Sequence, residues 1–300
     1  MVFAGQGAQS PGMGRDLYDG FDSARALYDA AEAVRPGVTA MCFGGPEAEL
    51  NRTQNAQPCL FLTDLAYAAA LSENGISVDG AAGFSLGEIP AMRFANVMDF
   101  GAAFDFVCFR ADVMGACASE RAGVMLAVLK LTAEQVEELC RSAPDAWAVN
   151  YNCPGQTVVA CAESSAQTLS EDAAKMGGKA VRLAVGGAFH SPYMEEASLQ
   201  AARYLENVAV NPPSVPLYSN VTALPYGGGA EEIKDLLARQ IRSPVLWRKT
   251  VENMAAAGFD TFIEAGPGKT LTGLIKKICP EARAFNVCDL KSLEEVKDKL

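Results

Sequence analysis

Histidine is nearly absent from this sequence: one residue of 300, His190, is a histidine. Basic residues are outnumbered as well, since 25 lysines and arginines stand against 36 aspartates and glutamates, a formal net charge of −11 at pH 7. That balance argues against nucleic acid as a partner, because a phosphate backbone is bound through a basic surface. No apolar run is long enough to span a bilayer, and no basic segment of a signal peptide begins the chain. We therefore expect a cytoplasmic protein that binds no membrane.

Paired cysteine motifs are also missing. The nine cysteines are odd in number and scattered, and no two have the spacing C-x-x-C. With one histidine in the chain, little remains to complete a zinc site, so we expect no metal. The pattern argues against a disulfide framework and fits a reducing compartment. Half of the residues are hydrophobic and a fifth are charged, which is typical of a globular protein.

The predicted elements fall into three stretches. Up to residue 121, short apolar segments such as "MVFA" and "VDGAAGF" alternate with helical patterns, as in an α/β protein. Residues 122–187 predict the order strand–helix–strand–strand–helix–strand of a ferredoxin-like unit. From residue 188 the α/β alternation returns in "VPLYSNVTA" and "DTFIEAGPG". We expect a large α/β domain, residues 1–121 and 188–300, with a small ferredoxin-like domain, residues 122–187, inserted into it.

Local patterns make this prediction specific. Residues 57–72 predict a buried helix, and residues 100–107 and 109–118 predict two successive helices. Thr132 and Gln135 have the spacing of a capping box, which predicts the start of a helix within the small domain.

A serine between two glycines lies where a predicted strand meets a predicted helix. In "AGFSLGEIPA", Ser85 is the centre of a G-x-S-x-G pattern. A nucleophile elbow requires such glycines, because larger side chains would clash in the tight turn, and the helix start directs backbone N–H groups at the reacting oxygen. The sequence favours Ser85 as a nucleophile. The alternative is a glycine-rich turn in which the serine caps the helix.

A serine nucleophile needs a base, and His190 is the one histidine that could serve. It follows a predicted strand end and precedes a turn, as a residue presented at a sheet edge would. Arg110 has only apolar neighbours three and four positions away on its predicted helix, so it lacks an intrahelical partner. A guanidinium buried in this way requires an anion. Either a distant acidic side chain or the carboxylate of a ligand could supply it.

Two glycine-rich stretches are similar to nucleotide motifs but lack required positions. "GQGAQS" has no third glycine of a dinucleotide fingerprint, and "AGPGKT" has Ile263 where a P-loop has its first glycine. We expect no nucleotide cofactor. Gln6, at the tip of the first predicted strand, carries an amide that could donate to an oxyanion.

Eight segments, taken in order, carry a resemblance to one family: "FAGQGAQ", "GFSLGE", "FRADVM", "VNYNCPGQ", "GAFHSPYM", "SNVTA", "RQIRSPVLW" and "EAGPGKTLTGL". The chain resembles malonyl-CoA:acyl-carrier-protein transacylase of fatty-acid synthesis and the related acyltransferase domains of polyketide synthases. The resemblance extends from residue 1 to about residue 288. It implies an α/β-hydrolase-like core with a ferredoxin-like insertion, in agreement with the predicted organisation.

The resemblance also implies a role for each candidate residue. Ser85 would be the nucleophile and His190 its base, with the imidazole oriented by a backbone carbonyl near Leu246. The oxyanion would be held by the Leu86 N–H and Gln6.

Three further residues would contact the substrate. Arg110 would grip the free carboxylate of the malonyl group, and Asn152, with its neighbour Asn150, would face the pocket. The implied reaction is ping-pong transfer of malonyl from malonyl-CoA, through a malonyl-serine, to the phosphopantetheine thiol of an acyl carrier protein, with no cofactor. The alternatives are an acyltransferase of a polyketide pathway, a serine esterase or thioesterase with the same dyad, and a non-catalytic module that binds a carrier.

The chain departs from the family at one position beside the serine. Phe84 stands where the family usually has histidine, which makes the pocket wall more apolar. "GAFH" is similar to the malonyl-type signature of polyketide acyltransferases. Because carrier proteins are generally acidic, we expect a local basic face on a monomer that binds its carrier transiently, and the candidates for it are Lys179, Arg182, Lys269, Lys276 and Lys277.

Overall fold

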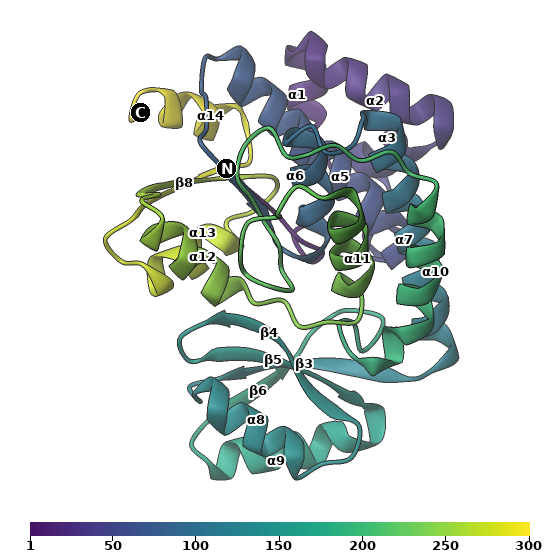
Figure 1. Ribbon diagram of the computed structural model, residues 1–300, viewed down its shortest axis with the longest axis vertical. Helices are drawn as coiled ribbons and strands as arrows, with labels where there is room; N and C mark the ends of the chain where they lie inside the picture. Colours follow the sequence, from purple (N-terminus) through teal and green to yellow (C-terminus); the bar gives the residue numbers. More distant parts are fainter.

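The computed structural model describes all 300 residues, and they form two separate sheets with helices around them (Figure 1). The larger body contains a five-stranded sheet in the order β7-β2-β1-β8-β9, and every neighbouring pair is parallel. Its strands are β1 (Val2–Phe3), β2 (Ala81–Gly83), β7 (Leu217–Tyr218), β8 (Thr261–Ala265) and β9 (Arg283–Val287). The predicted α/β class is therefore confirmed.

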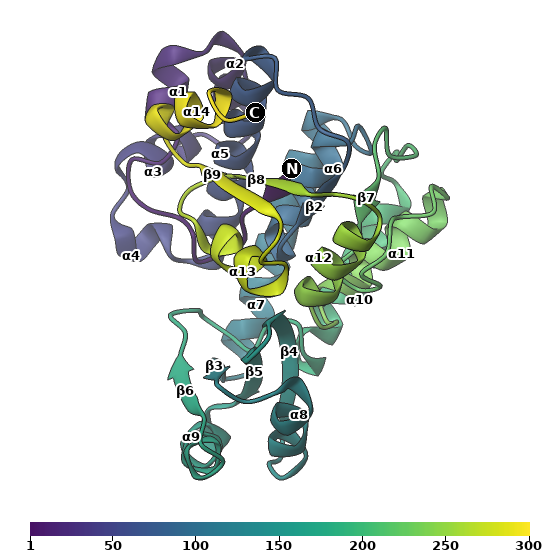
Figure 2. The ribbon, with the colours of Figure 1, turned by 90° about the vertical axis from the view of Figure 1, so that its left-hand side faces the viewer.

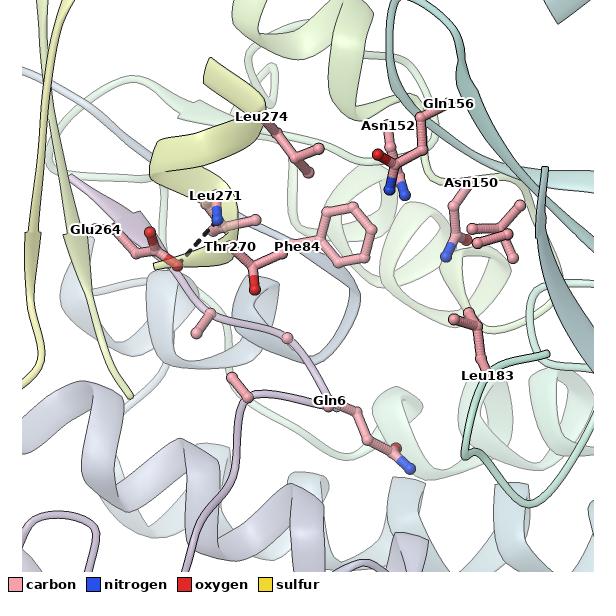
Figure 3. Close-up of a pocket in the computed structure, with 16 residues that line it drawn as sticks. Gln6, Phe84, Asn150, Asn152, Gln156, Leu183, Glu264, Thr270, Leu271 and Leu274 are labelled. Carbon is pink, nitrogen blue, oxygen red and sulfur yellow. Dashed lines mark hydrogen bonds between the residues drawn. The ribbon is translucent and has the colours of Figure 1, made fainter. Parts of the chain in front are cut away.

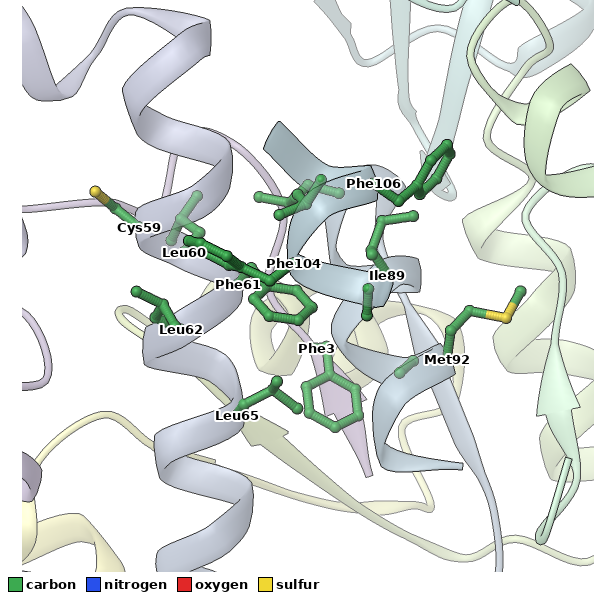
Figure 4. Packing of buried hydrophobic residues seen from close by; sticks show 14 of the residues in the cluster. Phe3, Cys59, Leu60, Phe61, Leu62, Leu65, Ile89, Met92, Phe104 and Phe106 are labelled. Atoms are coloured by element: carbon green, nitrogen blue, oxygen red, sulfur yellow. The ribbon is translucent and has the colours of Figure 1, made fainter. Parts of the chain in front are cut away.

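Helices pack on both faces of the parallel sheet because alternate strand residues point to opposite sides. Phe3 lies in a large apolar cluster with α5 (Thr53–Glu73), α6 (Glu88–Phe94) and α7 (Phe100–Glu120), as Figure 4 shows. Its neighbour Val2 belongs to a second cluster, formed with α12 (Trp247–Ala256) and α13 (Thr270–Ile278). The remaining helices of this body are α1 (Arg15–Gly20), α2 (Asp22–Val34), α3 (Val38–Gly44), α4 (Glu47–Leu50), α10 (Glu195–Glu206), α11 (Ala230–Gln240) and α14 (Leu290–Lys297).

The second sheet is antiparallel, with the strand order β4-β5-β3-β6. Along the chain its elements run β3 (Gly123–Leu129), α8 (Ala133–Arg141), β4 (Ala146–Cys153), β5 (Gln156–Ala162), α9 (Ala166–Lys175) and β6 (Lys179–Arg182). The two helices cover one face, where an apolar cluster includes Val136, Val159 and Leu169. Figure 2 shows these helices on the side away from the larger body. The other face of the sheet therefore looks toward that body.

Backbone hydrogen bonds join β4 of the small sheet to the segment of the larger body that precedes α12. The Tyr151 N–H donates to the Val245 carbonyl at 3.0 Å, and the Val245 N–H donates to the Val149 carbonyl at 2.7 Å. The segment before α12 thus continues the edge of β4, which fixes the position of the small sheet over the body.

Two helix predictions need correction. Where two helices were predicted over residues 100–107 and 109–118, the structure has the single helix α7. No proline or glycine lies between residues 102 and 114, and the apolar pattern continues through Cys108, so nothing ends the helix there. The helix predicted over residues 57–72 begins earlier, at Thr53, and contains Pro58. Proline cannot donate to the carbonyl of Gln54, and the Arg35 guanidinium donates to that carbonyl instead, at 2.9 Å.

The predicted capping box is confirmed. The Gln135 N–H donates to the Thr132 hydroxyl at 3.3 Å, and the Thr132 N–H donates to the Gln135 side chain at 2.8 Å, at the start of α8. No helix in the protein combines the length and the apolar character needed to cross a membrane.

Candidate active site

Ser85 occupies a sharp turn between β2 and α6. A short 3₁₀ turn, Ser85–Gly87, joins the strand to the helix, and Ser85 has a φ of 52°, a left-handed conformation that non-glycine residues rarely adopt. The two glycines of the motif are needed for space. A Cβ atom on Gly83 would lie 1.9 Å from the Gly87 carbonyl oxygen, and one on Gly87 would lie 2.2 Å from that of Phe3. The G-x-S-x-G pattern therefore forms a tight strand-to-helix turn with the geometry of a nucleophile elbow, which we call the elbow.

Asn220 holds this elbow in place from the neighbouring strand. Its side-chain oxygen accepts the Ser85 N–H at 2.7 Å, and its side-chain nitrogen donates to the Gly83 carbonyl at 2.6 Å. The residue lies just after β7, which pairs with β2 in the sheet. Sequence reasoning missed this role, although Asn220 lies in the "SNVTA" segment that carried part of the resemblance.

His190 meets Ser85 across 105 positions of sequence. The Ser85 Oγ and the His190 Nε2 are 2.7 Å apart, and the His190 Nδ1 is 2.9 Å from the Gln240 carbonyl oxygen. Because a carbonyl can only accept, Nδ1 carries the proton and Nε2 is left with the lone pair that faces the serine. The imidazole is thus in the tautomer that a general base requires.

The carbonyl that orients His190 is not the one expected. The resemblance suggested a position near Leu246, whereas the structure uses Gln240, the last residue of α11. The Leu246 carbonyl instead accepts the Thr250 N–H at 2.9 Å and the Thr250 hydroxyl at 3.1 Å. It is therefore engaged in the first turn of α12, whereas a carbonyl at the end of a helix is left without an intrahelical partner and can accept from His190.

His190 is neutral at physiological pH. Burial lowers the pKa of its imidazole to about 4, and the positive charge of Arg110 acts in the same direction. Hydrogen bonds to the Gln240 and Ser243 backbone oppose the shift. The imidazole can therefore accept a proton at pH 7 without first losing one.

Arg110, in the middle of α7, is buried, with 1% of its surface exposed, and its hydrogen-bond partners are neutral. Its Nη1 donates to the Gln57 side-chain oxygen at 2.7 Å, and its Nη2 donates to the Gln240 side-chain oxygen at 2.9 Å and to the Ser85 Oγ at 3.4 Å. No ion pair holds the guanidinium, and its Nε has no partner. Burial lowers its pKa to about 10, and the Glu88 carboxylate opposes that shift. The charge remains available beside the serine.

Gln57 and Gln240 complete the site, and neither was among the predicted site residues. Gln57 is wholly buried in the apolar helix α5. A polar side chain in an apolar helix is the same signal that identified Arg110, so the sequence could have indicated Gln57 as well. Gln240 was harder to find, because it is the last residue of an ordinary amphipathic helix, where a polar side chain is common. Its backbone carbonyl orients His190, and its side-chain nitrogen donates to the Ser85 carbonyl at 2.6 Å.

Two adjoining cavities open around Ser85 in the cleft between the two sheets. The inner one, of about 70 Å³, is lined by residues that include Gln6, Gln57, Ser85, Met114, Phe189 and His190. The outer one, of about 210 Å³, lies between the β1 end, α13 and the small sheet (Figure 3). Phe84 and Asn150 line both cavities. The ring of Phe84 packs edge-on against Trp247, with the ring centroids 5.7 Å apart. The two cavities therefore adjoin at Phe84 and Asn150, close to Ser85.

The other predicted site residues lie around these cavities. Gln6 follows β1, beside the elbow that follows β2, because the ends of neighbouring parallel strands share one edge. One Gln6 amide proton is donated to Thr53, at 3.2 Å. Leu86 is the residue after Ser85 in the 3₁₀ turn. Asn152 lines only the outer cavity, and the side-chain oxygens of Asn150 and Asn152 are buried without a partner. Asn150 also lines the inner cavity, together with Ser85, so it is the nearer of the two to the serine.

Comparisons with known proteins identify the family of the chain. Residues 1–293 match the family described as "Acyl transferase domain". The chain is 35% identical to the malonyl CoA-acyl carrier protein transacylase of Bacillus subtilis, over 98% of this chain and 94% of that protein. It is also 35% identical to the Haemophilus influenzae protein of the same name, over 100% and 98%.

Solved structures give the same result. The malonyl CoA-acyl carrier protein transacylase of Clostridium perfringens superposes with a TM-score of 0.94 at 34% identity, over 99% of this chain and 95% of that one. A malonyl-transacylase in complex with a type II PKS acyl-carrier protein superposes with a TM-score of 0.96 at 33% identity, over 100% and 99%. The chain belongs to the acyl transferase family. It is an acyltransferase, and the resemblance that its motifs indicated is confirmed.

Proposed function

We propose that this protein transfers the malonyl group from malonyl-CoA to the phosphopantetheine thiol of an acyl carrier protein, through a malonyl-serine at position 85. One observation carries the proposal: the Ser85 Oγ lies 2.7 Å from a neutral imidazole and 3.4 Å from a buried guanidinium that has no acidic partner. The first contact activates a nucleophile. The second places a positive charge where the free carboxylate of a short acyl group would lie.

The first half-reaction acylates the serine. His190 Nε2 takes the Ser85 proton as Oγ attacks the thioester carbon, and the oxyanion receives hydrogen bonds from the Leu86 N–H and the free amide proton of Gln6. Each donor contributes about 3 kcal/mol to such a transition state. When the C–S bond breaks, the imidazolium returns its proton to the CoA sulfur. In the second half-reaction the carrier thiol gives its proton to His190 and attacks the ester carbon. The bond to Ser85 Oγ then breaks, and the imidazolium returns the proton to Oγ, which regenerates the serine.

The substrate is selected by Arg110 together with the size of the inner cavity. A space of about 70 Å³ suits a short acyl group. A carboxylate at its end can be bound by the guanidinium, whose present acceptors are only neutral amides and a hydroxyl. The unpartnered oxygens of Asn150 and Asn152 are suited to accept the amide N–H groups of a pantetheine arm in the outer cavity.

The carrier protein docks, in this proposal, at the opening of the outer cavity. Thr270, Leu271 and Leu274 of α13 line that cavity, and Lys269, Lys276 and Lys277 belong to the same segment. These lysines are suited to an acidic partner. Arg182 suits it less well than expected, because both of its terminal nitrogens are paired with the Glu163 carboxylate.

We also propose that the chain divides as its sequence predicts. The division is an α/β-hydrolase-like domain of residues 1–121 and 188–300 and a ferredoxin-like domain of residues 122–187. It is supported by the strand order β4-β5-β3-β6, by the order of elements from β3 to β6, and by the elbow at the end of β2. The cytoplasmic location and the monomeric state stay predictions.

Mass spectrometry of the intact protein tests the function directly. After addition of malonyl-CoA, we expect a malonyl adduct on Ser85, which a phosphopantetheinylated carrier protein then removes. Ser85→Ala should give no adduct, and Arg110→Ala should lose malonyl transfer about 10³-fold while acetyl transfer is spared. If no adduct forms on the wild-type protein, the proposal fails. If water removes the adduct as fast as the carrier thiol does, the protein is an esterase or thioesterase.

A further inference from the structure

Glu88 is a buried carboxyl group one layer behind the catalytic residues. It is the first residue of α6, none of its surface is exposed, and each of its oxygens accepts hydrogen bonds. Oε1 accepts from the Tyr226 hydroxyl at 2.5 Å and from the Asn220 N–H at 3.2 Å, and Oε2 accepts from the Gln240 side-chain nitrogen at 2.9 Å. The mechanism proposed above does not use this group.

The side chain of Gln240 connects Glu88 to Arg110. Its nitrogen faces Glu88, which accepts, and its oxygen faces Arg110, which donates at 2.9 Å. Since an amide has one donor end and one acceptor end, the carboxylate fixes the orientation that the guanidinium needs. Glu88 is also the one acidic group whose charge acts on the pKa of Arg110. The positive and the negative charge therefore form a pair separated by a neutral amide.

The buried charges balance only when the site is empty. Arg110 and an ionised Glu88 sum to zero, and a substrate carboxylate bound to Arg110 would leave a net negative charge in a region of low dielectric. Adding a proton to Glu88 restores the balance. Burial already raises the pKa of this carboxyl to about 7, although the hydrogen bonds from Tyr226, Gln240 and Asn220 and the charge of Arg110 lower it. A second negative charge raises the pKa further.

We propose that Glu88 supplies the counter-charge of Arg110 in the empty site and becomes protonated when the carboxylate of a malonyl group binds Arg110. This inference rests on the proposed function. Acylation itself moves the Ser85 proton to the CoA sulfur, so the uptake at Glu88 is additional to the chemistry. Glu88 touches no substrate, and it acts by positioning Gln240 and by balancing the charge of Arg110.

Other titratable groups nearby do not take up this proton. The charged and titratable groups that face Glu88 are Arg110 from α7 and Tyr226 from the segment after β7. Burial and the adjacent carboxylate raise the pKa of Tyr226 well above its usual value, so its hydroxyl stays neutral. His190, whose pKa the charge of Arg110 also lowers, has a pKa of about 4 and stays unprotonated near pH 7. Between pH 6 and pH 8, Glu88 is the group that changes.

The experiment measures proton uptake when malonyl-CoA is mixed with the carrier-free enzyme at pH 7.5, in weak buffer with an indicator dye. Wild-type protein should take up on the order of half a proton per acylated serine. Glu88→Gln, which keeps the size of the side chain and cannot titrate, should form the same adduct with no additional uptake. Its KM for malonyl-CoA should stay flat above pH 7, where that of the wild type rises. Equal uptake by both proteins overturns the inference, whereas absence of the adduct overturns the proposed function.

Asp64→Asn is the matched control. Asp64 is equally buried, burial raises the pKa of its carboxyl well above the usual value, and neither of its oxygens has a hydrogen-bond partner. The charge of Asp64 is not among those that act on the pKa of Arg110, so the variant should take up protons as the wild type does. If Asp64→Asn loses the proton uptake, Asp64 and not Glu88 is the group that becomes protonated, and the proposal fails.

A second measurement does not depend on the folding of Glu88→Gln. Infrared difference spectra of ¹³C-glutamate-labelled wild-type protein, recorded before and after malonylation, should gain the band of a protonated glutamic acid. The band should shift in D₂O and should be missing after acetylation, because an acetyl group brings no second negative charge. Malonylation without this band contradicts the proposal.

Discussion

The two sheets of this protein solve different problems. The antiparallel sheet has strands of four to eight residues, with register shifts only between β4 and β5, and an apolar cluster lies between the sheet and its two helices. In the parallel sheet, β1 and β7 have two residues each and β2 has three, and the edge where they end holds a strained serine and a network of buried polar groups. The antiparallel sheet can therefore be stabilised by its packing against α8 and α9. The short strands depend on the helices around them, and they are arranged to place Ser85.

The largest effect is expected on the acylation rate, when His190 is removed. His190→Ala should slow acylation of Ser85 by about 10⁴-fold or more, since the nucleophile loses its base. Burst release of CoA measures this rate. An acylation rate within tenfold of the wild type would remove His190 from the mechanism.

The same variant should be less sensitive to acid than the wild type. The folded pKa of His190 is depressed to about 4 from a usual value of 6.5, so the unfolded chain binds the proton first as the pH falls. The wild type should therefore lose about 2 kcal/mol of unfolding free energy from this group between pH 7 and pH 5, and His190→Ala should not. Urea unfolding at pH 7 and pH 5 measures the difference between the two proteins.

The elbow should be the least tolerant place for a small substitution. Gly83→Ala places a Cβ 1.9 Å from a backbone oxygen, and we expect it to cost about 3 kcal/mol of unfolding free energy. Gly273→Ala in α13 is the control, because nothing lies within 4 Å of the added atom and alanine favours a helix. It should be neutral or stabilising. Equal destabilisation by the two variants would mean that crowding at the elbow is not what requires glycine.

A core substitution in the small sheet should affect stability alone. Val159 of β5 is wholly buried against α8 and α9, and Val159→Ala should lower the unfolding free energy by about 2 kcal/mol. The acylation rate per folded molecule should stay unchanged, which a burst measured at a temperature well below the unfolding transition would test. A tenfold loss of rate would contradict the division of labour between the two sheets.

The smallest effect is expected at the start of α8. Thr132→Ala removes the hydroxyl of the capping box and should lower the unfolding free energy by about 1 kcal/mol. Activity should not change. A loss of several kcal/mol in thermal unfolding would show that this helix start supports more than its own first turn.

The sequence predicted most of the fold because the local patterns agree with the final structure. The strand-to-helix turn at Ser85, the hairpin of β4 and β5, and the Thr132 capping box each depend on residues a few positions apart. Errors occurred where packing overrides local preference. Pro58 lies inside α5 because Arg35 satisfies the carbonyl that the proline leaves free, and nothing near Pro58 in the sequence indicates that contact.

The candidate site was predicted only in part. Ser85 and His190 stand out as a motif and as a single histidine, and Arg110 stands out as a charge among apolar neighbours. Asn220, Gln57 and Gln240 are uncharged residues of common types, and their importance comes from what they touch.

The sequence by itself determined which residues could react, because nucleophile, base and cation are properties of side chains and of the turn that presents them. The tertiary structure alone decided which carbonyl orients His190, which amides hold Arg110, and that Glu88 lies behind both. These contacts join α5, α6, α7 and α11 across as many as 152 positions of sequence. Such contacts follow from how helices pack on the sheet, and no local pattern encodes that packing.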